Sequence, residues 1–402
     1  MSARLLGVLA AMLALIGAAL ATGTNIYYYL FFILLVVIVF AGLSALWTLL
    51  TAQVSMKGVK SRVSRGDRLM TILTLSHKSL LPAGNLQVTL NVPGNASSRQ
   101  EISFSAAPFA RHSYRNVIRC IHRGNYEVGI RSMTAEDLFG LFRFTRKSKK
   151  KLMRVEVYPR AMEMPCMHLK PSDLGPEFRS RATEDAASPS DIRKWQEGDE
   201  LKKIHWKLSL RKRELMVRTF EESARPDTLI IPDMSEIAAL ADQKLTIEDA
   251  VCDACLGAVK AQLEGGFPVR MPLQCSRPQE LSGKTAADIG AFTDALMRAP
   301  FDSPYPYEQL LSLMMGRMQR TGGAVLITSR LTARIADIAL RMQRTGIQVK
   351  FVWITDAPRS ENLEMLERLK MTGSIVERID PWSEGGADAA VPVPDDGGMF
   401  DI

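Results

Sequence analysis

The hydrophobic pattern begins with two long uncharged stretches close to the amino end of the sequence. Residues 5–21 and 26–51 contain no Asp, Glu, Lys or Arg, and Thr22-Gly23-Thr24-Asn25 separates them. A helix needs about 20 apolar residues to cross a bilayer, so the second stretch is long enough and the first is at the short limit. The pattern therefore predicts a transmembrane helical hairpin within residues 1–54.

The charges that flank this hairpin predict its orientation. Arg4 precedes the first stretch, basic residues from Lys57 to Arg68 follow the second, and the loop between them carries no charge. The positive-inside rule then places both ends and the soluble remainder in the cytoplasm, with the lipid bilayer as a partner. A cleaved signal peptide is the alternative, because Ala19-Leu20-Ala21 resembles a cleavage site, but the retained hairpin is the favoured interpretation.

Residues 55–160 show a period of two, which is typical of half-buried strands. Residues 68–75 and 86–92 alternate between apolar and polar positions, and clusters of Pro, Gly and Asn punctuate the runs. Further strand-like runs fall near residues 101–105, 113–122, 126–132 and 152–158. Several short strands separated by turn residues predict a small β-sandwich.

From residue 225 onward, short apolar runs alternate with segments of helical spacing. The expected strands are 227–231, 267–273, 324–328, 348–355 and 374–379, and the expected helices are 247–263, 286–297, 307–320, 333–344 and 362–371. This alternation predicts a doubly wound parallel sheet with helices on both faces over residues 225–383. The whole chain is thus a membrane-anchored α/β protein. Its acidic tail, residues 384–402, is expected to be disordered.

Charge adds one feature to this organisation. The chain has 51 basic and 43 acidic residues, a net charge of +8. Residues 141–220 account for the surplus, with 20 basic and 11 acidic residues. A basic segment of this kind indicates an acidic partner, which is a lipid headgroup, a nucleic acid or an acidic protein face.

The basic signature segment, residues 161–224, also carries two tryptophans among its charges. Trp195 and Trp206 are expected to dock the segment onto the α/β domain, and Asp199 after Gly198 to cap a turn. A structural clasp or a protein interface is favoured here over a surface that binds nucleic acid or lipid.

Motifs that would indicate catalysis are incomplete. Cys252 and Cys255 form a C-x-x-C pair in the middle of an expected helix, where small buried cysteines are common. Gly283-Lys284-Thr285 lacks the earlier glycine of a phosphate-binding loop, and neither G-x-S-x-G nor H-E-x-x-H occurs. Five sparse cysteines favour reduced thiols over a disulfide scaffold. These observations favour a protein that is not an enzyme.

The signature segment resembles that of the bacterial family called domain of unknown function 58. The matching residues are Arg193, Trp195, Gly198, Asp199, Ile204, His205, Trp206, Val217, Arg218, Phe220 and Glu221. The run from Asp137 to Phe142 is similar to an upstream motif of that family. The resemblance implies a bacterial inner-membrane protein with a von Willebrand factor A-like C-terminal domain.

Domains of the von Willebrand type bind Mg²⁺ through Asp-x-Ser-x-Ser and later loops, and the resemblance directs attention to Asp233 and Ser235. Here Ile237 replaces the last serine, and where such domains often have Thr-Asp-Gly this chain has Thr328-Ser329-Arg330, so that Arg330 could supply a fixed positive charge in place of the metal. A metal-free recognition surface of Asp233, Ser235, Thr328 and Arg330 is therefore favoured. Mg²⁺ bound by Asp233 and Ser235 is the alternative.

Members of this family commonly accompany MoxR-type AAA+ ATPases and membrane proteins with a transglutaminase-like domain. The resemblance therefore implies these two kinds of partner. The leading hypothesis is a non-enzymatic membrane adaptor that presents its α/β domain to such an ATPase or its client. The alternatives are a metal-assisted, membrane-tethered hydrolase, and a basic segment that binds nucleic acid or anionic lipid.

Overall fold

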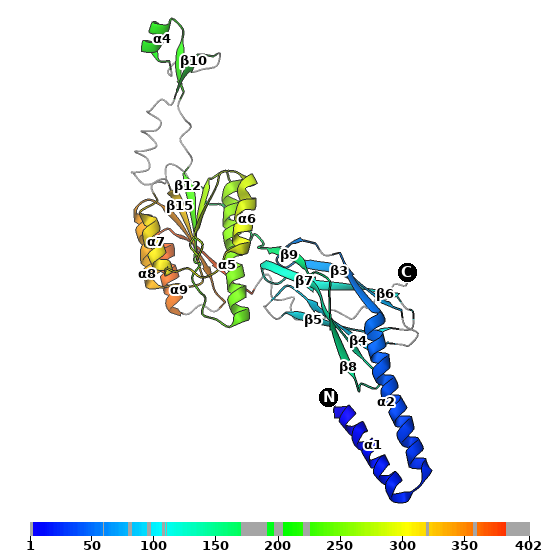
Figure 1. Ribbon diagram of the computed structural model, residues 1–402. Coiled ribbons are helices and arrows are strands. Elements are labelled where there is room, and N and C mark those ends of the chain that lie inside the picture. The colour runs from blue at the N-terminus through cyan, green and yellow to red at the C-terminus, as the bar shows by residue number, and fades with distance from the viewer. Residues whose placement is uncertain are drawn as a thin grey trace. The chain divides into compact units, whose positions relative to one another are not determined.

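A computed structural model describes residues 3–58, 60–78, 83–94, 98–106, 109, 111–169, 191–196, 204–219, 226–318, 321–356 and 360–382. These residues form two compact units, one within residues 1–158 and the other within residues 159–387 (Figure 1). The expected acidic tail, residues 384–402, lies outside the described residues.

The first unit begins with the expected helical hairpin. Helices α1 (Ala3–Thr22) and α2 (Asn25–Thr51) are both long and apolar enough to cross a membrane. The loop between them turns at Gly23, whose φ of +65° is a conformation that glycine adopts without steric cost. Small residues, Ala19, Ala41 and Ala45, are buried in these helices, where they allow two backbones to approach closely.

A β-sandwich follows directly from α2, as the sequence pattern predicts. One sheet has the order β1-β3-β6, with β1 (Ala52–Lys57), β3 (Arg68–His77) and β6 (Arg111–Arg119). The other has the order β2-β9-β7-β4-β5, and β8 also pairs with β7. Its strands are β2 (Arg62–Ser64), β4 (Ala83–Asn91), β5 (Arg99–Ala106), β7 (Gly124–Glu136), β8 (Arg143–Lys147) and β9 (Met153–Tyr158).

The sandwich core joins both sheets to the last turn of α2. Leu73 and Leu75 from the first sheet share a buried cluster with Val88 and Leu90 from the second, and Leu49 of α2 belongs to the same cluster. The apolar helical hairpin is therefore continuous with the sandwich core, rather than joined to it by a flexible linker.

The second unit contains a six-stranded sheet of order β14-β13-β12-β15-β16-β17. Its strands are β12 (Asp227–Pro232), β13 (Val269–Leu273), β14 (Gln279–Gly283), β15 (Thr321–Thr328), β16 (Gln348–Ile354) and β17 (Ile375–Ile379). All neighbours are parallel except β13 and β14, which are antiparallel. The five strands that the sequence predicts are all parallel, as expected, and the additional edge strand β14 makes the sheet mixed. The polar run of β14 gave no apolar signal because edge strands are half solvated.

Helices cover both faces of this sheet, as predicted (Figure 1). Ile230 packs in a core cluster with residues of α5 (Ala241–Glu264) and α6 (Ile289–Arg298). Leu229 and Ile231 pack on the opposite face with residues of α7 (Tyr307–Met315), α8 (Ala333–Arg344) and α9 (Ser360–Met371). Strand residues alternate between two buried faces, which explains the continuous apolar runs in the sequence. Cys252 and Cys255 lie buried in α5, in agreement with a packing role.

The signature segment contains a small element of two paired strands and one short helix, in the chain order β10-α4-β11, which we call the ββα element. Strand β10 (Asp191–Lys194) pairs antiparallel with β11 (Met216–Thr219), and α4 (Trp206–Lys212) connects back to β11. Ser209 of α4 accepts a hydrogen bond of 2.8 Å from the Met216 amide, which holds the short helix against the strand.

Candidate functional site at the ends of strands β12 and β15

The candidate site lies where two neighbouring parallel strands end in the middle of the sheet. From β12 the chain passes to β13 on one side, whereas β15 pairs with β12 on the other side. The carboxyl ends of β12 and β15 therefore meet at a topological switch point, where α/β sheets commonly form a ligand-binding crevice. The Asp233 amide donates to the Ile327 carbonyl at 2.8 Å and keeps the two strand ends together.

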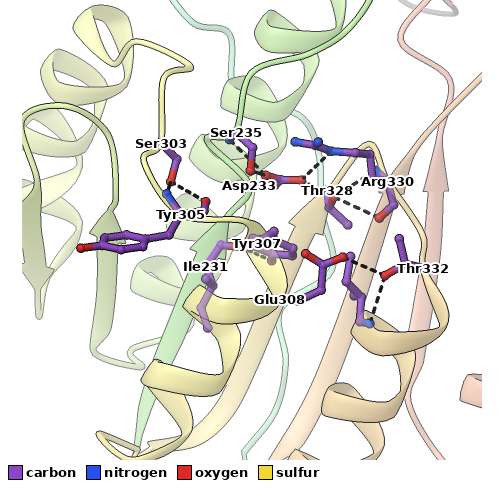
Figure 2. Close-up of polar contacts among 11 residues, drawn as sticks. Ile231, Asp233, Ser235, Ser303, Tyr305, Tyr307, Glu308, Thr328, Arg330 and Thr332 are labelled. Carbon is purple, nitrogen blue, oxygen red and sulfur yellow. Dashed lines mark hydrogen bonds and ion pairs between the residues drawn. The ribbon is translucent and has the colours of Figure 1, made fainter.

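Asp233 is the centre of a buried polar cluster (Figure 2). Its side chain is 3% exposed, yet both carboxylate oxygens accept hydrogen bonds. Oδ1 accepts from the Ser235 amide at 3.1 Å and from the Ser235 hydroxyl at 2.5 Å. Oδ2 accepts from the Thr328 hydroxyl at 2.7 Å. These bonds fix the carboxylate and offset the cost of burying its charge.

Arg330 supplies the counter-charge at the open side of this cluster. Its Nε lies 3.5 Å from Asp233 Oδ2, and its side chain is 48% exposed. Its backbone amide donates to the Thr328 hydroxyl at 3.0 Å, so the chain turns back over the strand end. The guanidinium therefore pairs with Asp233 and still presents donors to solvent. The structure brings together the four residues that the sequence analysis singled out.

The residues just before α7 and at its start also line the site, and the sequence analysis did not identify them. A cavity of about 320 Å³ is lined by Asp233, Ser235 and Arg330, and also by Ser303, Tyr305 and Glu308. Glu308 accepts a hydrogen bond of 3.0 Å from the Thr332 hydroxyl, which ties α7 to the start of α8. Figure 2 shows the exposed Tyr305 ring pointing away from Asp233. Pro304 and Pro306 mark a loop in the sequence, but nothing local relates that loop to Asp233.

Tyr307 has a structural role beneath the site. Its hydroxyl donates to the Ile231 carbonyl at 2.7 Å, and its ring is buried. Burial raises the pKa of this phenol well above its usual value, and the nearby charge of Asp233 adds to the effect. Tyr307 therefore stays protonated and holds α7 against β12.

The residues at this site do not fit a divalent ion. Ile237 packs against the apolar core instead of offering the hydroxyl expected of the motif. The Arg330 guanidinium occupies the carboxylate edge that a cation would share. The arrangement suits the recognition of a polar or charged group through hydrogen bonds.

The signature residues are distributed over the ββα element. Arg193 lies on β10 and Arg218 on β11, and the Trp195 amide donates to the Leu215 carbonyl at 2.8 Å. Ile204 is buried and pairs with Val217, whereas the Trp206 side chain on α4 is exposed. The expected cap by Gly198 and Asp199 lies outside the described residues. The described signature residues build this element, and their docking partner stays a prediction.

Comparisons with known proteins give distant structural similarities. The CARDB domain of a Pyrococcus furiosus protein, solved in complex with di-metal ions, is 12% identical, with a TM-score of 0.20, and the match covers 26% of this chain and 91% of that one. β-Glucosidase from Listeria innocua in complex with gluconolactone is 11% identical, with a TM-score of 0.18, and the match covers 26% of this chain and 16% of the enzyme. No curated protein matches the sequence.

A family comparison is more informative, because it covers the ββα element and most of the six-stranded sheet. The family described as "Protein of unknown function DUF58" matches residues 191–373. This range contains the signature residues from Arg193 to Arg218 and the whole strand-end cluster around Asp233. The chain therefore carries a DUF58 family domain over residues 191–373.

Proposed function

We propose that this protein is a membrane-anchored, non-enzymatic adaptor whose α/β domain recruits a MoxR-type AAA+ ATPase to the cytoplasmic face of the bacterial inner membrane. The fold of that domain is taken to be von Willebrand factor A-like. A transglutaminase-like membrane protein is a further proposed partner. The apolar hairpin supplies the anchor, and the strand-end cluster supplies the recognition surface.

The Asp233–Arg330 pair is the observation that supports this proposal. The pair closes the site where a von Willebrand factor A domain would hold a metal, and it leaves the guanidinium half exposed. Arg330 can therefore bind a partner carboxylate directly through its remaining donors. Arginine is enriched among the residues that dominate protein interfaces.

The same contacts argue against hydrolysis at this site. A general base needs a carboxylate that is open to the reacting proton, but Asp233 is buried and already accepts bonds from Ser235 and Thr328. Tyr307 stays protonated and is committed to a backbone carbonyl. The cluster is therefore suited to holding its shape and not to proton transfer.

Affinity purification of the full chain from native membranes tests the proposal. The preparation uses mild detergent and a non-hydrolysable ATP analogue, and compares the wild type with Asp233→Ala. Recovery of an AAA+ ATPase that the variant loses would support recognition at the strand ends. Equal recovery would indicate that the ATPase contacts another part of the chain. Catalytic turnover by the purified protein, abolished by Asp233→Ala, would refute a non-enzymatic role.

A second candidate function rests on α4. Trp206 and Leu210 are both exposed and lie four residues apart, so they share one face of the helix, with Lys207 and Arg211 beside them. An apolar stripe flanked by cations fits an anionic lipid surface. Binding of the full chain to anionic vesicles should then weaken with salt and with Trp206→Ala; binding to nucleic acid instead would contradict this candidate.

A further inference from the structure

The turn that joins β7 to β8, residues 137–142, holds two apolar side chains in solvent. Leu138 is 62% exposed and Phe139 is 54% exposed. Asp137 is buried and fixes the turn, because its carboxylate accepts from the Phe139 amide at 3.0 Å and from the Phe142 amide at 2.6 Å. The hydrogen-bonded turn therefore holds Leu138 and Phe139 in their exposed positions, and their exposure does not come from an irregular loop.

This turn lies against both helices of the hairpin. The Phe142 ring is 3.5 Å from the place that a β-carbon on Gly42 of α2 would occupy. Arg4, at the start of α1, donates to the Phe139 carbonyl at 3.5 Å. Figure 1 shows β8 beside α2 and close to the amino end of α1.

Helix geometry places these contacts at one end of the membrane span. Two sequence separations can be compared. The number of residues from Arg4 to the end of α1 at Thr22 is about the same as the number from the start of α2 at Asn25 to Gly42. At 1.5 Å per residue, both lie about 26 Å from the hairpin loop. The hydrocarbon core of a bilayer is about 30 Å thick, so Arg4 and Gly42 lie near its boundary.

The chemistry of the turn fits that depth. Aromatic and aliphatic side chains are favourable at the boundary between acyl chains and headgroups, where backbone groups still reach water. Trp47 and Leu50, which follow Gly42 on α2, are also exposed. At 1.5 Å per residue, Trp47 and Leu50 lie about 8 and 12 Å beyond Gly42, so the exposed apolar side chains continue from the level of the turn into the headgroup region.

We propose that the 137–142 turn is an interfacial lipid anchor, in which Leu138 and Phe139 insert into the leaflet beside the end of the helical hairpin. Arg4 remains at the headgroup level and ties the turn to α1. The anchor would hold the sandwich at a fixed distance from the bilayer surface. It rests on the membrane hairpin and does not depend on the strand-end site.

Depth-dependent quenching tests this anchor in the full chain. Phe139→Cys is labelled with an NBD fluorophore in a Cys166→Ser background, and the protein is reconstituted into phosphatidylcholine–phosphatidylglycerol vesicles. Four native cysteines are buried, and burial raises the pKa of the Cys120 thiol to about 11, with the charge of Asp67 adding to the rise. These thiols are therefore expected to stay unlabelled in the folded protein.

Met70→Cys is the matched control. Met70 is 60% exposed on β3, but it lies seven residues from His77, which pairs with Ala52 at the end of α2. That separation is about 23 Å along the strand. Nitroxide groups placed near the lipid headgroups should quench the probe at residue 139 at least about threefold more than the probe at residue 70.

Two results would overturn the anchor. One is no quenching at residue 139 in vesicles where α2 is shown to be embedded, and the other is equal quenching at residues 139 and 70. If Phe139→Cys does not fold, Leu138→Cys gives the same comparison, because both side chains project from the same turn.

Discussion

At the scale of single residues, the buried charge of Asp233 organises the candidate site. Three of its hydrogen bonds come from Ser235 and Thr328, and these residues lie at the ends of different strands. Burying a carboxylate costs free energy unless the carboxylate accepts hydrogen bonds. The removal of one hydrogen-bond donor is therefore expected to lower the stability of the protein.

Thr328→Val keeps the shape of the side chain but removes the 2.7 Å bond to Asp233. The free energy of unfolding is expected to fall by about 1–3 kcal/mol, because a charged acceptor loses a partner in a buried place. Thermal unfolding of the detergent-solubilised chain measures this change. Ser329→Ala, one residue along, leaves the bonds to Asp233 in place and should cost less than about 0.5 kcal/mol. Equal losses for the two variants would contradict the role given to Thr328.

At the scale of elements, α5 packs against the first residues of the second unit. The Met162 amide donates to the Asp253 carbonyl at 3.2 Å, and the Arg160 amide donates to the Asp253 carboxylate at 2.8 Å. Gly257, one turn further along α5, leaves the space that the Met162 backbone occupies. A side chain at residue 257 would collide with that backbone.

Gly257→Ala is therefore expected to destabilise the protein by about 1–3 kcal/mol, although alanine favours helices. Gly290→Ala in α6 is the matched control, because a β-carbon there meets no atom within 4 Å apart from the neighbouring backbone of its own helix. The control should be neutral or stabilising by up to about 1 kcal/mol. Chemical unfolding measures the difference in stability between the two variants. A stabilising effect of Gly257→Ala would contradict the close approach of the Met162 backbone to α5.

Asp288 caps the short helical turn that precedes α6. Its carboxylate accepts from the Lys284 and Thr285 amides at 2.8 and 2.9 Å, and these bonds hold the pKa of Asp288 below its usual value. A carboxyl whose pKa is lowered on folding stabilises the protein fully above its unfolded pKa, near 4. That stabilisation is lost as the pH falls through the lower, folded pKa.

Asp288→Asn should therefore lower the unfolding midpoint at pH 7, and the gap from the wild type should shrink below about pH 4. Thermal unfolding of both proteins from pH 3 to pH 7 checks this dependence. A gap that is constant over the whole range would show that the charge of Asp288 does not contribute. The same bonds occupy the Lys284 and Thr285 amides, which a phosphate-binding loop would turn toward its phosphate.

At the scale of the whole molecule, the sequence predicts the order of modules and most elements. The apolar hairpin, the period-two module and the alternating α/β half all carry strong local patterns. The sequence does not predict strands β1, β2, β8, β10, β11 and β14 or helix α4, because these elements are short or polar, or because they continue directly from α2. The partners of Asp233 at Thr328 and Arg330 followed from the resemblance, whereas Tyr305 and Glu308 approach Asp233 only through tertiary packing.

The membrane topology makes a prediction for the whole chain. A tag at residue 1 and the second unit should both be protected from protease in spheroplasts and accessible in inverted vesicles, because basic residues flank both outer ends of the hairpin. Immunoblotting of the two preparations measures this. Loss of the tag from the mature protein would indicate a cleaved signal peptide, and digestion in spheroplasts would reverse the orientation.

The affinity of a purified MoxR-type ATPase for the full chain in nanodiscs tests the adaptor role most directly. The ATPase is held with a non-hydrolysable ATP analogue, and the wild type is compared with Arg330→Ala and with Trp206→Ala as a control. Binding is expected to be weaker by about tenfold or more for Arg330→Ala, equivalent to about 1.4 kcal/mol, and unchanged for Trp206→Ala. Equal affinity for the wild type and Arg330→Ala, or no binding at all, would contradict it.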